Sequence, residues 1–239
     1  MSLVGEVKRK REFSELPDSV VERALKNSGG DVKLARALLR KYFGVFLTNR
    51  VLKGSGDLLG VHMSSKKRDY KNFYGEIFSV IGDAGGVVDL GCGVNGFSYR
   101  YLPDGVSYVG VEAVGQLVDL TNDYFKENNY NGKVVCLDLF DVGRVVKILE
   151  GAEKPRVVFM LQVVDALESL ERDFSKKFIL EVAKECEWIV LTLPTESLGK
   201  RRKFVVQRKW MLKFLEENFL IEKNFAGGGE KIIILKNKK

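Results

Sequence analysis

The chain has 239 residues, which is enough for one large α/β domain with a small appended domain. Lysine and arginine number 39 against 32 acidic residues, and the formal net charge of +7 favours a polyanionic partner. No apolar run has membrane-spanning length and the basic N-terminus lacks the apolar core of a signal peptide, so we expect a cytoplasmic protein without a membrane partner. Three isolated cysteines and one histidine do not have the spacing of zinc ligands, so we expect no metal. We expect Cys136 and Cys186 to be small buried apolar residues.

The first 60 residues have the pattern of a small helical domain. Residues 1–12 are highly charged, and we expect them to be frayed. An N-cap signal at residues 17–19 predicts a helix over 19–28, which Gly29 and Gly30 end. Asp31 can cap a second helix over 32–43, where apolar residues recur at helical spacing. We therefore predict a helical N-terminal domain over residues 1–60 and a second domain over residues 61–239.

The second domain alternates helices and strands. A helix is expected over 66–81, and the later helices near 114–129, 141–149, 173–185 and 203–217. Strands are expected near 86–90, 107–111, 133–137, 156–161, 187–193, 219–225 and 231–236. This alternation predicts an α/β fold with a doubly wound, mostly parallel, seven-stranded, Rossmann-like sheet. The glycines at 227–229 predict a hairpin that makes one strand antiparallel.

A glycine turn directly after the first strand carries the clearest functional signal. Gly91 and Gly93 let the backbone approach a ligand closely, because glycine has no Cβ and tolerates unusual φ angles. Together with Gly96 they also fit the dinucleotide pattern G-x-G-x-x-G, but Asp89 before the turn would repel a pyrophosphate. The turn therefore favours a nucleoside ligand without phosphates.

The next two strands also end in carboxylates. Glu112 lies about 20 residues after the glycine turn, where an acid commonly binds ribose hydroxyls, and Asp138 can accept from an adenine amino group. A cationic nucleoside without phosphates fits these acids, which points to S-adenosylmethionine as the cofactor. An ordinary parallel-sheet protein with acids placed by chance and an NAD-type oxidoreductase are the alternatives.

These three motifs resemble those of class I methyltransferases: DLGCG at residues 89–93, VGVEA at 109–113 and LDLF at 137–140. Three further segments resemble the 16S rRNA guanine-N7 methyltransferases of aminoglycoside resistance: VHMSSKKR at 61–68, LQVVDALE at 161–168 and LPTESLGKRRKF at 193–204. The resemblance covers roughly residues 60–239. It implies S-adenosylmethionine as the cofactor, ribosomal RNA or the small ribosomal subunit as the partner, and guanine N7 as the methyl acceptor.

The resemblance also implies roles for particular residues. The implied cofactor-binding residues are His62, Ser64, Lys66, Asp89, Gly91, Gly93, Glu112, Ala113, Asp138, Leu139 and Gln162. Two of them depart from the family, since Lys66 replaces an arginine that holds the cofactor carboxylate and Gln162 replaces a lysine; lysine keeps the charge but loses the bidentate geometry.

Asp165 and Glu168 are the expected catalytic residues, because a carboxylate can stabilise the positive charge of a base methylated at N7. For Glu168, a helix-capping role is the alternative. The basic residues expected to bind RNA lie in two of the matched segments and are Lys67, Arg68, Lys200, Arg201, Arg202 and Lys203. The helical domain over residues 1–60 is also expected to bind RNA, and residues 61–239 are expected to form the S-adenosylmethionine-binding methyltransferase domain.

The expected function is therefore S-adenosylmethionine-dependent methylation of ribosomal RNA. One alternative is a methyltransferase for a protein or a small molecule, in which the basic clusters have no role. Another is a catalytically silent RNA-binding relative, suggested by the departures at Lys66 and Gln162.

Overall fold

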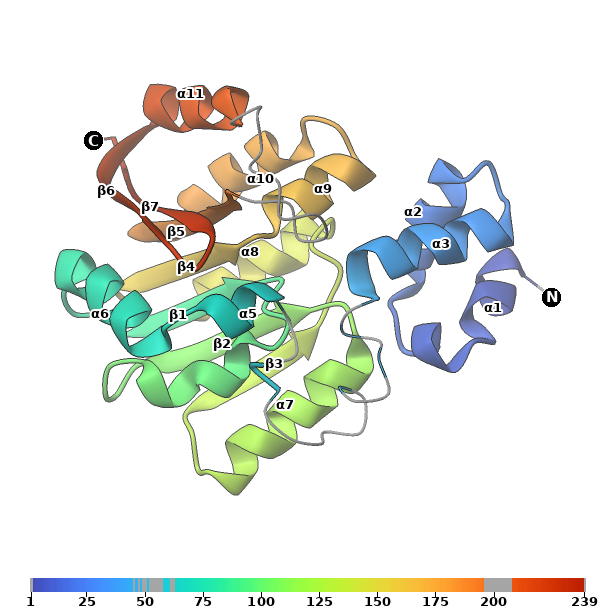
Figure 1. The fold of residues 1–239 in the computed structure, drawn as a ribbon, viewed down its shortest axis with the longest axis horizontal. Coiled ribbons are helices and arrows are strands. Elements are labelled where there is room, and N and C mark those ends of the chain that lie inside the picture. Colours follow the sequence, from blue (N-terminus) through green and yellow to red (C-terminus); the bar gives the residue numbers. More distant parts are fainter. Residues whose placement is uncertain are drawn as a thin grey trace.

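The computed structural model describes residues 2–44, 46, 48, 51, 58–60, 63–195 and 208–238. A seven-stranded sheet forms its centre, with strand order β3-β2-β1-β4-β5-β7-β6 (Figure 1). The strands are β1 (Gly86–Leu90), β2 (Ser107–Glu112), β3 (Gly132–Cys136), β4 (Arg156–Leu161), β5 (Trp188–Pro194), β6 (Phe219–Gly227) and β7 (Glu230–Asn237). Strand β7 lies between β5 and β6 and runs antiparallel to both. The predicted fold class is confirmed, including the hairpin after Gly227.

The central strands are mostly apolar because helices cover the sheet on both faces. In β1, all five residues are buried, and Val88 lies opposite Val109 of β2 and Val158 of β4. The order in which successive strands are added to the sheet changes direction between β1 and β4. Strands β2 and β3 lie on one side of β1, whereas β4 and β5 lie on the other side. In open α/β sheets, the crevice at the carboxyl ends of two such strands is where ligands bind.

Each face of the sheet packs against its own set of helices (Figure 1). On one face lie α8 (Val142–Glu150), α9 (Val164–Leu170), α10 (Phe174–Ala183) and α11 (Lys209–Asn218). On the other lie α6 (Tyr70–Ile81), the 3₁₀ helix η2 (Asn95–Tyr101) and α7 (Gly115–Glu127). None of the helices in the described ranges is long and apolar enough to cross a membrane.

The N-terminal helices pack together beside the sheet (Figure 1). They are α1 (Leu3–Lys8), the 3₁₀ helix η1 (Arg11–Phe13), α2 (Asp18–Asn27) and α3 (Val32–Phe43). The expectation that residues 1–12 are frayed is wrong, because Val7 is buried among the helices despite its charged neighbours. This apolar cluster continues into Val94, Val114 and Leu117 of the sheet domain, so the N-terminal module and the sheet domain share a core.

Three further details differ from the sequence-based expectations. The helix expected over 66–81 is divided into α5 (Met63–Lys67) and α6, because the Asp69 side chain caps α6 by accepting from the N–H of Asn72 at 3.2 Å. Helix α9 was not predicted. Cys136, expected to be a buried apolar residue, is exposed because β3 is an edge strand.

Candidate functional site

A cavity of about 380 Å³ lies at the carboxyl ends of the central strands, next to the reversal point between β1 and β4. Residues at the ends of β1, β2, β3 and β4 line it, together with α9 and the N-terminal helices α2 and α3. Its volume lies in the range of about 300–1,000 Å³ that small-molecule sites occupy. The predicted crevice therefore exists, and the N-terminal module forms part of its wall.

The glycine turn after β1 brings backbone to the cavity. Gly91 lines it with a φ of 72°, and a Cβ at this position would lie 2.9 Å from Cγ2 of Val163. Gly93 has a φ of 50° and donates its N–H to Oε2 of Glu112 at 2.9 Å. Both conformations suit glycine, and the turn holds the next carboxylate in place.

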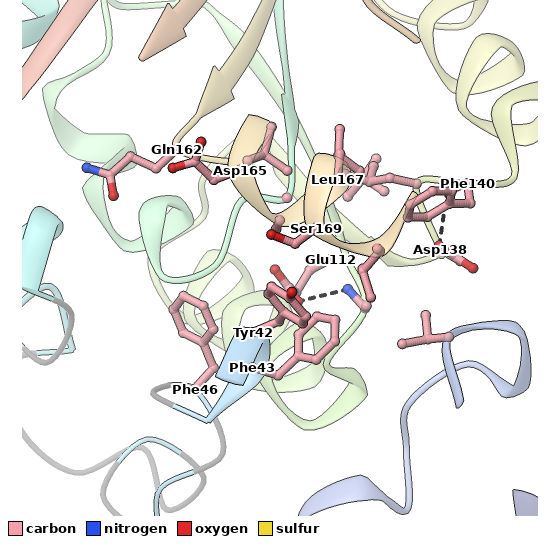
Figure 2. Close-up of a pocket in the computed structure, with 18 of the residues that line it drawn as sticks. Tyr42, Phe43, Phe46, Glu112, Asp138, Phe140, Gln162, Asp165, Leu167 and Ser169 are labelled. Atoms are coloured by element: carbon pink, nitrogen blue, oxygen red, sulfur yellow. Dashed lines mark hydrogen bonds between the residues drawn. The ribbon is translucent and has the colours of Figure 1, made fainter. Parts of the chain in front are cut away.

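Glu112 is held by three backbone donors. Its Oε1 accepts from the N–H groups of Ala113 at 2.8 Å and Val114 at 3.0 Å, in addition to the Gly93 bond at Oε2. Burial raises the pKa of Glu112 above its ordinary value, while the three backbone hydrogen bonds oppose that shift. The three hydrogen bonds thus fix the position and orientation of the Glu112 carboxylate at the cavity wall (Figure 2).

Asp138 lies at one end of the cavity beside Phe140, and Gln162 and Asp165 lie at the other end (Figure 2). The Oδ1 atom of Asp138 accepts from the N–H of Phe140 at 3.0 Å, and Oδ2 accepts from the hydroxyl of Ser19 at 2.8 Å. Glu112 at the end of β2 and Asp138 after the end of β3 therefore line the same cavity.

The structure brings together most of the residues predicted to bind the cofactor. Those that line the cavity are Gly91, Glu112, Ala113, Asp138, Leu139 and Gln162. Gly93 supports Glu112, as described above. Lys66 is an exposed residue of α5 and is not among the lining residues. His62 and the side chain of Ser64 lie outside the described part of the chain.

Asp89 differs from the other predicted cofactor residues because it is fully buried behind the glycine turn. Its Oδ2 accepts from Nδ2 of Asn95 at 2.6 Å and from the hydroxyl of Tyr108 at 2.8 Å, whereas Oδ1 is buried without a hydrogen-bond partner. Burial raises the pKa of Asp89 to about 6 despite these two bonds. Asp89 therefore stabilises the glycine turn through its hydrogen bond with Asn95 and does not line the cavity.

Gln162 is anchored from two sides in a left-handed backbone conformation with a φ of 60°. Its N–H donates to Oγ1 of Thr192 at 3.0 Å, and its Nε2 donates to Oε1 of Glu230 at 2.5 Å. Non-glycine residues held in this conformation are concentrated at functional sites. The anchoring orients Gln162 at the cavity even though it replaces the lysine of the resembling family.

Arg68 does not have the exposed position that contact with RNA phosphates requires. One of its terminal nitrogens donates to both carboxylate oxygens of Glu230 at 2.8 Å, and its side chain is only 6% exposed. The guanidinium carbon also lies 4.6 Å from the ring centroid of Phe73. Arg68 thus has a structural role as the ion-pair partner of Glu230. The prediction that it contacts RNA is corrected accordingly. Lys67 is exposed, and residues 200–203 lie outside the described ranges.

The two predicted catalytic carboxylates have different surroundings. Glu168 accepts from the N–H groups of Asp173 at 2.9 Å and Ser175 at 3.0 Å, so it caps the start of α10 and does not line the cavity. The capping alternative thus accounts for Glu168. Asp165 lines the cavity and forms a two-point ion pair with Arg208, whose Nε lies 2.7 Å from Oδ1.

Sequence reasoning missed the contribution of the N-terminal module to the cavity. Its lining residues are Val20, Arg23, Lys41, Tyr42, Phe43 and Phe46. Tyr42, Phe43 and Phe46 project into the site near Glu112 (Figure 2). Helical spacing in α3 indicated an apolar face but did not show what that face covers. Within the described ranges, no group of three or more His, Cys, Asp or Glu side chains is arranged to hold a metal ion.

Comparison with known proteins identifies the family. Residues 47–217 match the family model described as ribosomal RNA methyltransferase (FmrO). No curated protein matches the chain significantly.

Several solved structures share the fold over nearly their whole length. The 16S rRNA methyltransferase RmtF in complex with S-adenosyl-L-homocysteine is 17% identical, with a TM-score of 0.80, and the match covers 99% of this chain and 97% of RmtF. The 16S rRNA methylase RmtB is 20% identical, with a TM-score of 0.76 and coverage of 99% and 97%. An rRNA methylase from Escherichia coli is 19% identical, with a TM-score of 0.71 and coverage of 99% and 98%. Because the family model matches well over half of the chain, the chain belongs to the FmrO family of ribosomal RNA methyltransferases.

Proposed function

We propose that this chain uses S-adenosylmethionine to methylate guanine N7 in 16S ribosomal RNA. The observation that carries the proposal is the cavity at the reversal point of the sheet, with Glu112 and Asp138 fixed in its wall. The complex of the similar RmtF with S-adenosyl-L-homocysteine supports the cofactor. Family membership and the 16S rRNA methylases of the same fold support the RNA substrate.

The lining residues fit this cofactor chemically. Glu112 accepts three hydrogen bonds, and a carboxylate has about four acceptor sites, so it can still accept from a ribose hydroxyl. Asp138 and the backbone of Leu139 would hold the adenine, and Gln162 lies where the methionine end would extend. The carboxylates of Glu112 and Asp138 at the ribose and adenine positions disfavour phosphates there. When bound, S-adenosylmethionine supplies an electrophilic methyl group.

The residues around the cavity suit an acceptor that needs no base. Guanine N7 carries an available lone pair, so no proton has to be removed before the methyl group is transferred. Asp165 is engaged by Arg208, and Glu168 caps α10, which leaves neither carboxylate placed as a general base. The protein would then act by holding the acceptor in line. Asp165 lines the cavity, but its ion pair with Arg208 offsets its charge, so it would stabilise the cationic product base less than a free carboxylate would.

Exposed basic residues of the N-terminal module support an RNA partner near the cavity. They are Arg9, Lys10, Arg11, Lys26, Lys33, Arg40 and Lys41. Lys41 also lines the cavity, so positive charge reaches its mouth. Cytoplasmic ribosomal subunits would be the substrate. Lys67 and residues 200–203 remain predicted RNA contacts.

Nucleoside analysis tests the proposal. Purified small ribosomal subunits are incubated with the protein and labelled S-adenosylmethionine, and the 16S rRNA is digested to nucleosides. We expect the label in 7-methylguanosine. Label in another nucleoside would refute the N7 assignment, and label in protein would refute the RNA substrate. Cofactor binding without transfer would indicate the silent RNA-binding alternative.

The pH dependence of a single turnover tests the absence of a base. We expect a nearly flat rate between about pH 6.5 and 8.5, because no titrating group has to lose a proton in the reaction. A log-linear rise across this range would instead indicate a base-assisted reaction at an amine or a hydroxyl.

A further inference from the structure

One face of helix α2 docks against the end of the cavity that contains Asp138. Ser19, Arg23 and Asn27 follow one another at the four-residue spacing that places side chains on the same helix face. The Ser19 hydroxyl donates to Oδ2 of Asp138 at 2.8 Å, and Nδ2 of Asn27 donates to the carbonyl oxygen of Leu170 at 2.9 Å. The N-terminal module is thus attached to the ends of both β3 and α9.

Arg23, the middle residue of this face, lines the cavity itself. Its guanidinium carbon lies 3.7 Å from the ring centroid of Phe140, which is a stacking distance. One terminal nitrogen lies 3.6 Å from Oδ2 of Asp138, and the other donates to Oε2 of Glu171 at 3.2 Å. The guanidinium plane is therefore fixed at the carboxylate that we assign to adenine.

Arg23 also retains an unused hydrogen-bond donor. Its Nε is buried without a hydrogen-bond partner. Buried donors in native proteins nearly always have a partner. Because Arg23 lines the cavity, a ligand bound there is one source of the missing acceptor. The ring nitrogens of adenine are hydrogen-bond acceptors, which is the type of partner that Nε of Arg23 lacks.

We propose that Arg23 is a cofactor-positioning residue supplied by the N-terminal module, and that adenine binding is coupled to the docking of α2. This inference rests on the proposed function, since it assumes an adenosyl ligand in the cavity. Coupling is reciprocal, so a ligand at Asp138 that strengthens the docking of α2 must bind more tightly when α2 is docked. The module would therefore complete the cofactor site in addition to contacting RNA.

Calorimetric titration of the full chain with S-adenosylhomocysteine and with adenosine tests the proposal. Arg23→Lys keeps the charge but removes the planar group and the Nε donor. We expect it to weaken both ligands by a similar factor of about five or more, because both carry the adenine. The matched control is Arg36→Lys in the same module, whose Nε donates to the carbonyl oxygen of Val7 at 3.4 Å and which is not among the cavity-lining residues. It should leave both affinities unchanged.

Unchanged affinity of Arg23→Lys would overturn the inference, as would an equal loss in Arg36→Lys. If the wild-type chain bound neither ligand, the proposed function would fail together with the inference. Hydrogen exchange of the wild-type protein provides a test that needs no variant. S-adenosylhomocysteine should slow amide exchange in α2 more than in α1, and equal protection of the two helices would refute the coupling.

Discussion

Replacing Glu112 by glutamine tests the centre of the site, because the two carboxylate oxygens have unequal surroundings. Oε1 accepts two backbone N–H groups and Oε2 accepts only that of Gly93, so the amide oxygen should occupy the Oε1 position. The amide NH₂ would then face the N–H of Gly93, and leaving this buried donor unpaired should cost about 1–3 kcal/mol of folding stability. Loss of a charge-assisted hydrogen bond to the ribose should cost about 1.5–3 kcal/mol of binding, a 10- to 150-fold lower affinity by the usual conversion.

Titration calorimetry with S-adenosylhomocysteine measures the affinity, and urea denaturation measures the free energy of unfolding. Asp119→Asn is the matched control, because it removes the same charge from an exposed position on α7. It should change neither quantity appreciably. A folded Glu112→Gln variant that binds the ligand as tightly as the wild type would refute the ribose assignment.

Three further substitutions probe the supports of the site. The pKa of Asp89 is raised from 3.8 to about 6, so the wild type should lose stability relative to Asp89→Asn as the pH rises from about 4 to 7, by roughly 3 kcal/mol in denaturation experiments. A constant difference between the two would contradict this. Gly91→Ala places a Cβ 2.9 Å from Val163 at a positive φ, so we expect a loss of about 1–2 kcal/mol in urea denaturation and weaker ligand binding by calorimetry; wild-type values for both would show that the turn tolerates a side chain. Arg68→Met leaves the buried charge of Glu230 without its ion-pair partner, so we expect the free energy of unfolding to fall by about 3–5 kcal/mol in denaturation experiments. Adding Glu230→Gln should recover much of this loss. A double variant no more stable than the single one would exclude a charge effect.

Local patterns predicted the sheet domain because each element carries its own signal. Apolar runs gave the strands, and in a parallel sheet the residues after each strand meet at one edge, which brought Glu112 and Asp138 into one cavity. Helix α9 was missed because its seven residues are too few to show a clear helical period.

Contacts between distant segments could not be predicted in the same way. Arg68 stands in a run of basic residues and was expected at the surface, but α5 ends at Lys67 and Arg68 pairs with Glu230, which lies 162 positions away. The docking of Arg23 beside Asp138 is likewise a contact between two modules, and neither local sequence indicates it. The charge of these side chains was evident from the sequence, but their partners were not.

The position of β7 has a consequence for the biosynthesis of the protein. This strand is translated after β6 but lies between β5 and β6, so β6 has no neighbour in the sheet until β7 has been made. The same strand begins with Glu230, which anchors both Arg68 and Gln162. A nascent chain that ends before Glu230 therefore has a sheet of five paired strands and lacks the anchor of its cavity. The anchoring of Gln162 at the cavity therefore forms only after β7 has been translated.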